Sequence, residues 1–157
     1  MIRELKTKED LYSIEEKGEY ILLNDIDCDN DSLKCLLKSF KGTIDGAGHS
    51  IKRIVISDII WGDEQTLALF YNMSKATIKN LMIEDIKLEY EEGFYTPRVA
   101  LLGGKCSDCT FINIKVIASN SSEDKTPMFY DLNHCVNDNN SIKCNNKASI
   151  IAKYEEK

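Results

Sequence analysis

The sequence predicts an all-β fold, a short right-handed parallel β-helix of roughly four or five coils with an N-terminal α-helical cap. After residue 18 the chain consists of short apolar segments separated by Gly, Asn, Asp and Ser. Three of these segments, 51–56, 78–83 and 111–116, superimpose at offsets of 27 and 33 residues. Because one such coil cannot bury its own apolar face, several must stack to build a core.

The segment 7–17 is predicted to be the capping helix. Thr7 and Asp10 have the spacing of a capping box, and Leu11 and Ile14 lie on one helical face. Gly18 is suited to end the helix. A helix at this end would cover strand edges that an open solenoid end leaves unpaired.

The chain is interpreted as one β-helix domain, 1–157, in which 20–117 form regular coils and 118–157 form irregular last coils and a tail. A second set of matches, at 68–70, 100–102 and 128–130, has offsets of 32 and 28 residues. Asn80 and Asn113 occupy the same position in their segments. The apolar segment 148–152 is expected either to close the last coil or to pair with a second copy of the chain.

Composition narrows the function. The 157 residues carry a net charge of −6, which opposes direct binding of nucleic-acid phosphates. No apolar run reaches the roughly 18 residues of a membrane span. The first residues lack the apolar core of an export signal, so a cytoplasmic location is expected.

The six cysteines are expected to be reduced and mostly buried, as is typical of a cytosolic protein. Cys106 and Cys109 have the spacing of half a zinc ribbon, and His134 stands beside Cys135. Whether zinc binds at Cys106, Cys109, Cys135 and Cys144 stays open, and disulfides are a further alternative. The leading interpretation assigns no metal and no cofactor.

Two runs carry a family resemblance: YILLNDID at 20–27 and FKGTIDGAGHSI at 40–51, continued by 69–70 and 76–81. They resemble right-handed parallel β-helix modules of bacterial surface proteins, which occur beside GLUG repeats and in the non-catalytic part of immunoglobulin-A-cleaving peptidases. The resemblance covers about 7–117. It implies a spacer or adhesive scaffold and no particular activity.

Asp25, Asp27 and Asp45 are the candidates for chemistry of the kind β-helix enzymes perform. Clustered aspartates hold calcium in pectate lyases and activate water in polygalacturonases. Asp45, however, opens a glycine-rich turn, and the other two are suited to capping a loop. Turn chemistry is the favoured interpretation, so no catalytic residue is assigned and the chain is not expected to be an enzyme.

Three insertions, at 57–66, 89–98 and 119–126, are expected to emerge from one edge of the stack. Their net charges of −3, −2 and −1 account for the whole net charge of −6. Aromatic side chains supply contact area, and carboxylates attract a basic partner. The predicted contact residues are Trp61, Asp63, Glu64, Tyr90, Glu91, Glu92, Phe94 and Tyr95. The alternative is that the loops are only solvated, with Trp61 and Phe94 folded back over the coil corners.

These features favour a non-enzymatic protein-binding module with a basic protein partner. The more specific hypothesis is a small phage or mobile-element inhibitor of a nucleic-acid-handling host defence complex, comparable to an anti-CRISPR protein. One alternative is a carbohydrate-binding or polysaccharide-lyase-like β-helix. Another is a structural oligomeric component, including a homodimer through the C-terminal end.

Overall fold

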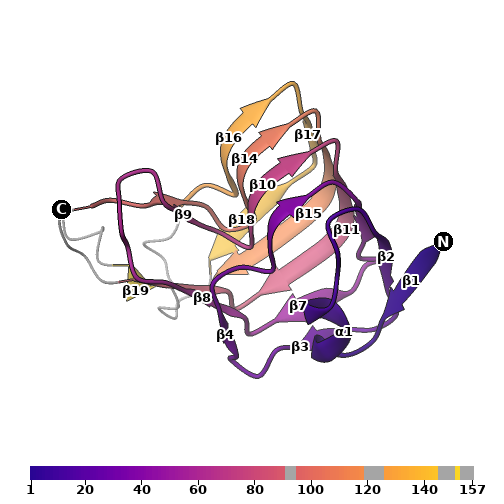
Figure 1. Cartoon of the computed structure of the whole chain (residues 1–157). Helices are drawn as coiled ribbons and strands as arrows, with labels where there is room; N and C mark the ends of the chain where they lie inside the picture. The colour runs from indigo at the N-terminus through magenta and orange to yellow at the C-terminus, as the bar shows by residue number, and fades with distance from the viewer. Residues whose placement is uncertain (91–94, 119–125, 145–150, 153–157) are drawn as a thin grey trace.

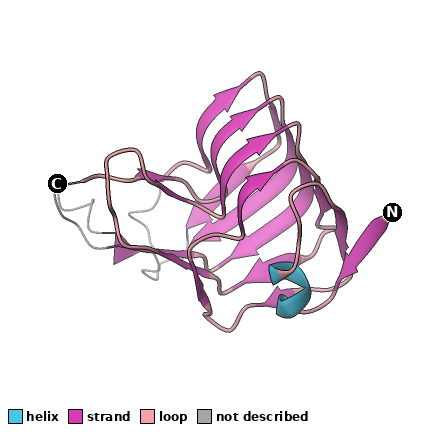
Figure 2. Cartoon of the chain, in the orientation of Figure 1, coloured by secondary structure: helices cyan, strands magenta, loops and turns pink. Residues whose placement is uncertain are grey.

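Parallel strand pairing builds almost the entire fold. The computed structural model describes residues 1–90, 95–118, 126–144 and 151–152. Within these ranges the protein is all-β apart from one short helix, and every strand pair is parallel (Figure 2). Parallel neighbours need long connections, so each sheet is assembled from segments far apart in the sequence.

The largest sheet has nine strands and follows the path β1-β2-β6-β11-β15-β17, with β3, β7 and β18 beside it (Figure 1). Its strands are β1 (Ile2–Leu5), β2 (Glu19–Leu22), β3 (Ile26–Asp27), β6 (Thr43–Asp45), β7 (Ser50–Lys52), β11 (Thr77–Glu84), β15 (Thr110–Ala118), β17 (Val136–Asp138) and β18 (Ser141–Cys144). The long strands β11 and β15 each span two short ones: β11 pairs with β6 and β7, and β15 with β17 and β18.

Three smaller sheets complete the fold. Their orders are β16-β14-β10-β5, β19-β12-β8-β4 and β13-β9. The strands are β4 (Ser32–Leu33), β5 (Leu37–Phe40), β8 (Val55–Ser57), β9 (Thr66–Leu67), β10 (Phe70–Ser74), β12 (Lys87–Tyr90), β13 (Arg98–Val99), β14 (Gly103–Ser107), β16 (Phe129–Asn133) and β19 (Ile151–Ala152). In Figure 1, β10, β14 and β16 lie side by side, as do β11 and β15.

The helix α1 (Lys8–Tyr12) is shorter than the predicted 7–17. The capping box forms as predicted: the Thr7 side chain accepts from the Asp10 backbone N–H, and the Asp10 carboxylate accepts from the Thr7 N–H. The helix ends at Tyr12 with Ser13 as its C-cap, well before Gly18, and its last turn has no basic side chain to favour the helix dipole. Leu11 is buried in the core.

The stacking register differs from the predicted one. Ile78 pairs with Phe111, which confirms the offset of 33. On its other side Ile78 pairs with Ile44, and Ile51 pairs with Ile83, so the offset of 27 is wrong. The prediction placed 51–56, which contains most of β7 and of β8, on the single strand β11. In the structure β7 pairs with the part of β11 that follows the left-handed residue Asn80, and β8 pairs with β12. The second set is also out of register, since Phe70 pairs with Gly103 and Gly103 with Phe129.

Left-handed residues recur between successive strands and inside β11 and β15. Their φ angles lie between 52° and 62°. They fall into three groups: Lys75, Asp108 and His134; Ala47, Asn80, Asn113 and Asn139; and Asp29, Asn30, Arg53 and Asp85. Backbone hydrogen bonds join members of a group to the next circuit, meaning the next set of strands that pairs with their own. The Lys75 N–H donates to the Ser107 carbonyl, and the Asp108 N–H to the Asn133 carbonyl, each at 3.0 Å.

Apolar side chains fill the space enclosed by the sheets. Phe40 stacks on Phe70 with ring centroids 5.2 Å apart, and Phe111 stacks on Phe129 at 4.1 Å. The buried cluster runs from Leu5 to Phe129 and includes three of the cysteines that were expected to be buried. Burial of one continuous apolar column across all the sheets is the main stabilising contribution.

Regular pairing continues beyond the predicted limit of 117. Strands β16, β17 and β18 lie in 126–144 and pair in register with β14 and β15. Their polar sequence conceals this, because the outermost layer has only one apolar face to bury. The strand β1 was also not predicted, since its first three residues are exposed. From the segment 148–152, Ile151–Ala152 pair with β12 of the same chain.

Candidate binding surface

Two of the predicted insertions are neighbours in the structure. Ser57 pairs with Glu89 where the insertions begin, and Thr66 pairs with Arg98 where they end. The strand pairs β8–β12 and β9–β13 therefore place the two ends of loop 58–65 beside the end of β12 and the start of β13. Of the segment between β12 and β13, residues 91–94 lie outside the described part of the chain, as do residues 119–125 of the third insertion.

The side-chain amide of Gln65 organises loop 58–65. Its oxygen accepts from the Trp61 backbone N–H at 2.6 Å. Its nitrogen donates to the Ile59 carbonyl at 2.7 Å and to the Asp58 carboxylate at 3.1 Å. Asp58 also accepts from the Ile59 backbone N–H at 2.8 Å. One side chain thus fixes both arms of the loop, which limits the conformational entropy that binding would cost.

Two large apolar side chains project from this braced loop. Trp61 is 73% exposed and Ile59 is 66% exposed. Tyr95, at the start of the described part of the neighbouring segment, is also exposed. Trp61 does not fold back over the neighbouring strands, so the alternative that its ring covers a coil corner is wrong. Exposed aromatic and aliphatic anchors on a rigid loop are typical of binding surfaces.

The charges at this surface are partly paired. Glu64 accepts from Arg98 at 3.0 Å, and the Arg98 guanidinium lies 5.4 Å from the centre of the Tyr130 ring. Asp58 is engaged with Gln65. Asp63 adds a further carboxylate to the exposed loop. Glu64 and Asp58 are therefore both engaged by side chains of this chain, and Arg98 is the cation already counted in the net charge of the second insertion.

The structure changes the set of predicted contact residues. Tyr90 is only 6% exposed, because in β12 it alternates with Glu89 and points into the core with Leu88; it is removed from the set. Trp61, Asp63, Glu64 and Tyr95 lie at or beside loop 58–65, whereas Glu91, Glu92 and Phe94 lie outside the described residues. Ile59 and Gln65 were missed, although their place inside the same insertion was visible in the sequence.

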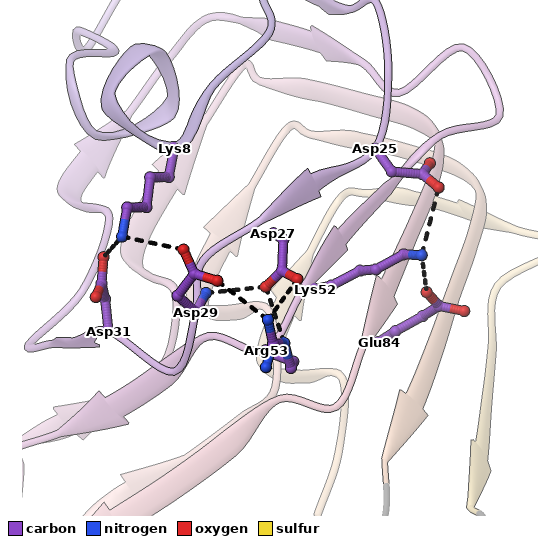
Figure 3. Close-up of polar contacts among 8 residues, drawn as sticks. All are labelled: Lys8, Asp25, Asp27, Asp29, Asp31, Lys52, Arg53 and Glu84. Atoms are coloured by element: carbon purple, nitrogen blue, oxygen red, sulfur yellow. Dashed lines mark hydrogen bonds and ion pairs between the residues drawn. The ribbon is translucent and has the colours of Figure 1, made fainter.

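Two of the three predicted aspartates, Asp25 and Asp27, form ion pairs with basic side chains (Figure 3). Asp27 binds Arg53 through both oxygens, at 2.9 and 2.6 Å, and Arg53 also reaches Asp29 at 3.1 Å. Lys52 bridges Asp25 at 3.4 Å and Glu84 at 3.5 Å. These contacts link successive circuits, because Asp27 pairs with Lys52 in the sheet.

Each of the three aspartates also accepts from a backbone N–H near a turn or from the next circuit. Asp25 accepts from Ser50 at 2.9 Å, Asp27 from Asp29 at 2.9 Å, and Asp45 from Ala47 at 2.9 Å. The Ser50 bond holds the pKa of Asp25 below its usual range, and the Arg53 bond does the same for the pKa of Asp27. Turn bonds occupy Asp27 and Asp45, as the favoured interpretation predicted, whereas Asp25 accepts from Ser50 on the neighbouring strand instead of capping the loop that follows it.

Three thiols meet at the corner that follows β14. The Cys109 backbone N–H donates to the Cys135 sulfur at 3.4 Å, and the Cys135 thiol lies 3.5 Å from the Cys106 carbonyl. The Cys109 thiol lies 3.3 Å from the Ser107 carbonyl. Burial raises the pKa of the Cys106 thiol well above its usual value. The thiols of this cluster serve as weak donors to backbone carbonyls, and all three cysteines are free.

A polar groove crosses the outer face of the second sheet. Its cavity of about 290 Å³ lies along β5, β10, β14 and β16. In sheet register, Ser39 pairs with Asn72, Asn72 with Lys105, and Lys105 with Asp131. Hydroxyl, amide and charged groups therefore line up in one row across four strands.

The described residues include no group of three or more His, Cys, Asp or Glu side chains that could hold a metal ion. In the same residues, no helix has both the length and the apolar character for crossing a membrane. Comparisons of this chain with protein-family models, with curated proteins and with solved structures found no match.

Proposed function

We propose that this chain is a protein-binding module that uses loop 58–65 as its contact surface. The observation that carries the proposal is the exposure of Trp61 on a loop that a single side chain, Gln65, braces from both sides. Leaving a tryptophan in water is unfavourable, and ordering a loop is costly. Both features make sense if a partner covers the Trp61 ring.

The scaffold that presents this loop is proposed to be a short right-handed parallel β-helix capped by α1. Support comes from the recurrent parallel pairing of distant segments and from left-handed residues that recur between successive strands. The right-handed sense follows the general preference of crossovers between parallel strands. In such a scaffold, segments that follow equivalent strands emerge on one flank, as loop 58–65 and residues 95–97 would.

The proposed partner is a protein with a basic surface. Asp58, Asp63 and Glu64 give the loop carboxylates beside its apolar anchors, and the chain as a whole carries a charge of −6. Such a surface is suited to occupying a groove that otherwise binds nucleic-acid phosphates. Inhibition of a basic, nucleic-acid-handling complex, in the manner of an anti-CRISPR protein, is the specific form of this proposal.

A pull-down with matched variants tests the contact surface. The tagged wild-type chain and the double variant Ile59→Ala/Trp61→Ala are incubated with the same bacterial lysate, and the retained proteins are identified by mass spectrometry. Ile2→Ala, at an exposed apolar residue of β1, is the control. A partner bound through loop 58–65 is lost from the double variant and kept by the control.

The charge contribution is measured separately with Asp63→Lys. If the partner is basic, this variant weakens binding most at low salt, since screening reduces the effect as ionic strength rises. Retention of every captured protein by the double variant would show that loop 58–65 is not the contact surface.

A second candidate function is carbohydrate binding, which the polar groove favours. Its row of Ser39, Asn72, Lys105 and Asp131 offers donors and acceptors at strand spacing, which suits an extended chain of hydroxyl groups. A glycan array probed with the wild type and with Asn72→Ala tests it. Binding that Asn72→Ala abolishes would support this function, and an array without binding would reject it.

A further inference from the structure

The last layer of the stack leaves three strands with one unpaired edge. Strand β16 pairs only with β14, and β17 and β18 pair only with β15. No other described strand lies against their outer edges. Backbone N–H and C=O groups along such an edge are ready to pair with another strand, so an edge of this length is a docking site unless it is covered.

Apolar side chains accompany this edge. Val136 is 51% exposed, and Leu132 and Tyr130 are exposed as well. A cavity of about 320 Å³ opens beside them, and its floor contains Met128 and Phe129, the last members of the core. The end of the core cluster therefore borders this cavity, although Met128 and Phe129 are themselves only 7% and 8% exposed.

The opposite end of the stack differs. There α1 buries Leu11, and Ile14 after it joins the same core cluster. Only β1 continues the sheet at that end, with three of its four side chains exposed. The two ends are therefore not complementary, and a head-to-tail array of copies would place α1 against the open layer.

We propose that the open layer β16–β18 is the interface of a symmetric dimer, in which it packs against the same layer of a second copy. Across a two-fold axis the facing strands run antiparallel, so their outward N–H and C=O groups can pair. Such a dimer does not extend into a longer array, because α1 caps the far end of each copy. This dimer is independent of the proposed function of loop 58–65.

The described part of the layer carries few charges, so a second copy can approach it. Asp131 and Asp138 are the only formally charged residues among the described side chains of strands β16, β17 and β18, and Asp131 stands opposite Lys105 in the sheet. Like layers therefore meet with little repulsion. The amide ladder also ends here: Asn139 donates to Asn113 and is its last described rung. Amide groups can both donate and accept, so a like rung is a suitable neighbour.

The oligomeric state tests this proposal. Sedimentation velocity of the full chain at about 100 µM is expected to show a species of twice 17.9 kDa, which dissociates on dilution. Val136→Lys places a charge at the middle of the edge, and we expect it to raise the dissociation constant at least about tenfold. Ile59→Lys, at an equally exposed apolar residue of loop 58–65, should leave the dimer unchanged.

Two controls keep the outcome interpretable. Circular dichroism and thermal melting establish that Val136→Lys is folded, and Leu132→Lys repeats the test at a second position on the same face. A wild-type chain that stays monomeric at about 100 µM overturns the proposal and leaves the face to another occupant, such as residues 145–157 or a different protein. A dimer that both lysine variants leave intact overturns the assignment of this face.

Discussion

The side-chain amide of Asn113 donates to the side-chain oxygen of Asn80 across 3.1 Å, although 33 residues separate them in the sequence. Both residues have left-handed backbones, with φ of 55° and 54°. Asn80 in turn donates to Asp45 at 3.3 Å, and Asn139 donates to Asn113. One residue type therefore meets two needs at this corner: it tolerates the backbone conformation, and it joins one circuit to the next.

The ladder predicts a defined order of stability among variants of Asn113. Asn113→Gly keeps the left-handed backbone accessible and loses only the side-chain bonds, at a cost of about 1 kcal/mol. Asn113→Ala loses the same bonds and adds backbone strain of about 1 kcal/mol. Urea unfolding followed by circular dichroism should rank wild type above Gly and Gly above Ala. An alanine variant as stable as the glycine variant would show that the backbone conformation is not the constraint.

Gly46 is predicted to be intolerant of any side chain. A Cβ atom there would lie 2.4 Å from the Asn80 carbonyl oxygen and 2.6 Å from the Leu81 Cα, and both are backbone atoms that cannot move aside. Gly46→Ala should therefore lower the unfolding free energy by several kcal/mol, at the upper end of single substitutions, about 3 or more. Gly62→Ala is the matched control, since nothing lies within 4 Å of its added Cβ. Equal melting temperatures for the two variants would contradict the close packing of circuits at Gly46.

The sequence predicted the strand content and the stacking of Asn80 with Asn113, because both depend on local patterns. It failed on register. The match of 51–56 with 78–83 rested on apolar residues at equal spacing, and such spacing does not distinguish the two halves of β11. Which half stacks on which strand depends on where the left-handed residue falls, and that is fixed by contacts with the neighbouring circuit.

The candidate surface was predicted only in part. The insertion containing Trp61 was recognisable by its length and composition, but the bracing by Gln65 depends on the loop geometry. Tyr90 was misassigned because the insertion was taken to begin at 89, whereas β12 continues to Tyr90 and directs that ring inward. The exact end of a strand is the least certain feature of a sequence pattern.

Acid is predicted to weaken the network around Asp27. The bond from Arg53 lowers the pKa of Asp27 in the folded protein, whereas the pKa of an unfolded aspartate is about 3.9. Since the folded pKa is the lower one, the stabilising contribution is present above the unfolded pKa and is lost as the pH falls through the folded pKa. The unfolding free energy of the wild type should therefore drop on acidification below about pH 5.

Asp27→Asn isolates this contribution. The variant should be less stable than the wild type at neutral pH, and the difference should shrink as the pH falls, because the wild-type carboxylate is then protonated as well. Asp63→Asn, in loop 58–65, serves as the control with a carboxylate outside the network. A constant difference between Asp27→Asn and wild type from pH 7 to 3 would show that the pair with Arg53 contributes no pH-dependent stability.

Cys106 is predicted to be chemically inert in the folded protein. Burial shields its sulfur and raises the pKa of its thiol, so the reactive thiolate is scarce. Iodoacetamide at pH 8, followed by peptide mass spectrometry, should modify Cys106 only after unfolding in urea. Modification in the native state at the rate seen in urea would mean that the corner after β14 opens readily.

Gln65 is predicted to control the mobility of loop 58–65, and the chain carries its own reporter, because Trp61 is its only tryptophan. Gln65→Ala removes the acceptor for the Trp61 N–H and the donor to the Ile59 carbonyl. The steady-state fluorescence anisotropy of Trp61 should fall, since the freed loop samples more conformations during the excited-state lifetime. The melting temperature should change little, because the lost bonds lie in an exposed loop away from the core.

Asn72→Ala provides the comparison, since it removes another exposed side-chain amide but lies on β10. Its Trp61 anisotropy should equal that of the wild type. If Gln65→Ala left the anisotropy unchanged, the loop would be held by its other contacts. If it lowered the melting temperature strongly, the Gln65 amide would be a stabilising element of the fold. Reduced anisotropy with an intact fold would instead mean that Gln65 pre-organises Trp61 for contact, and partner binding should then weaken in Gln65→Ala through the entropy of reordering the loop.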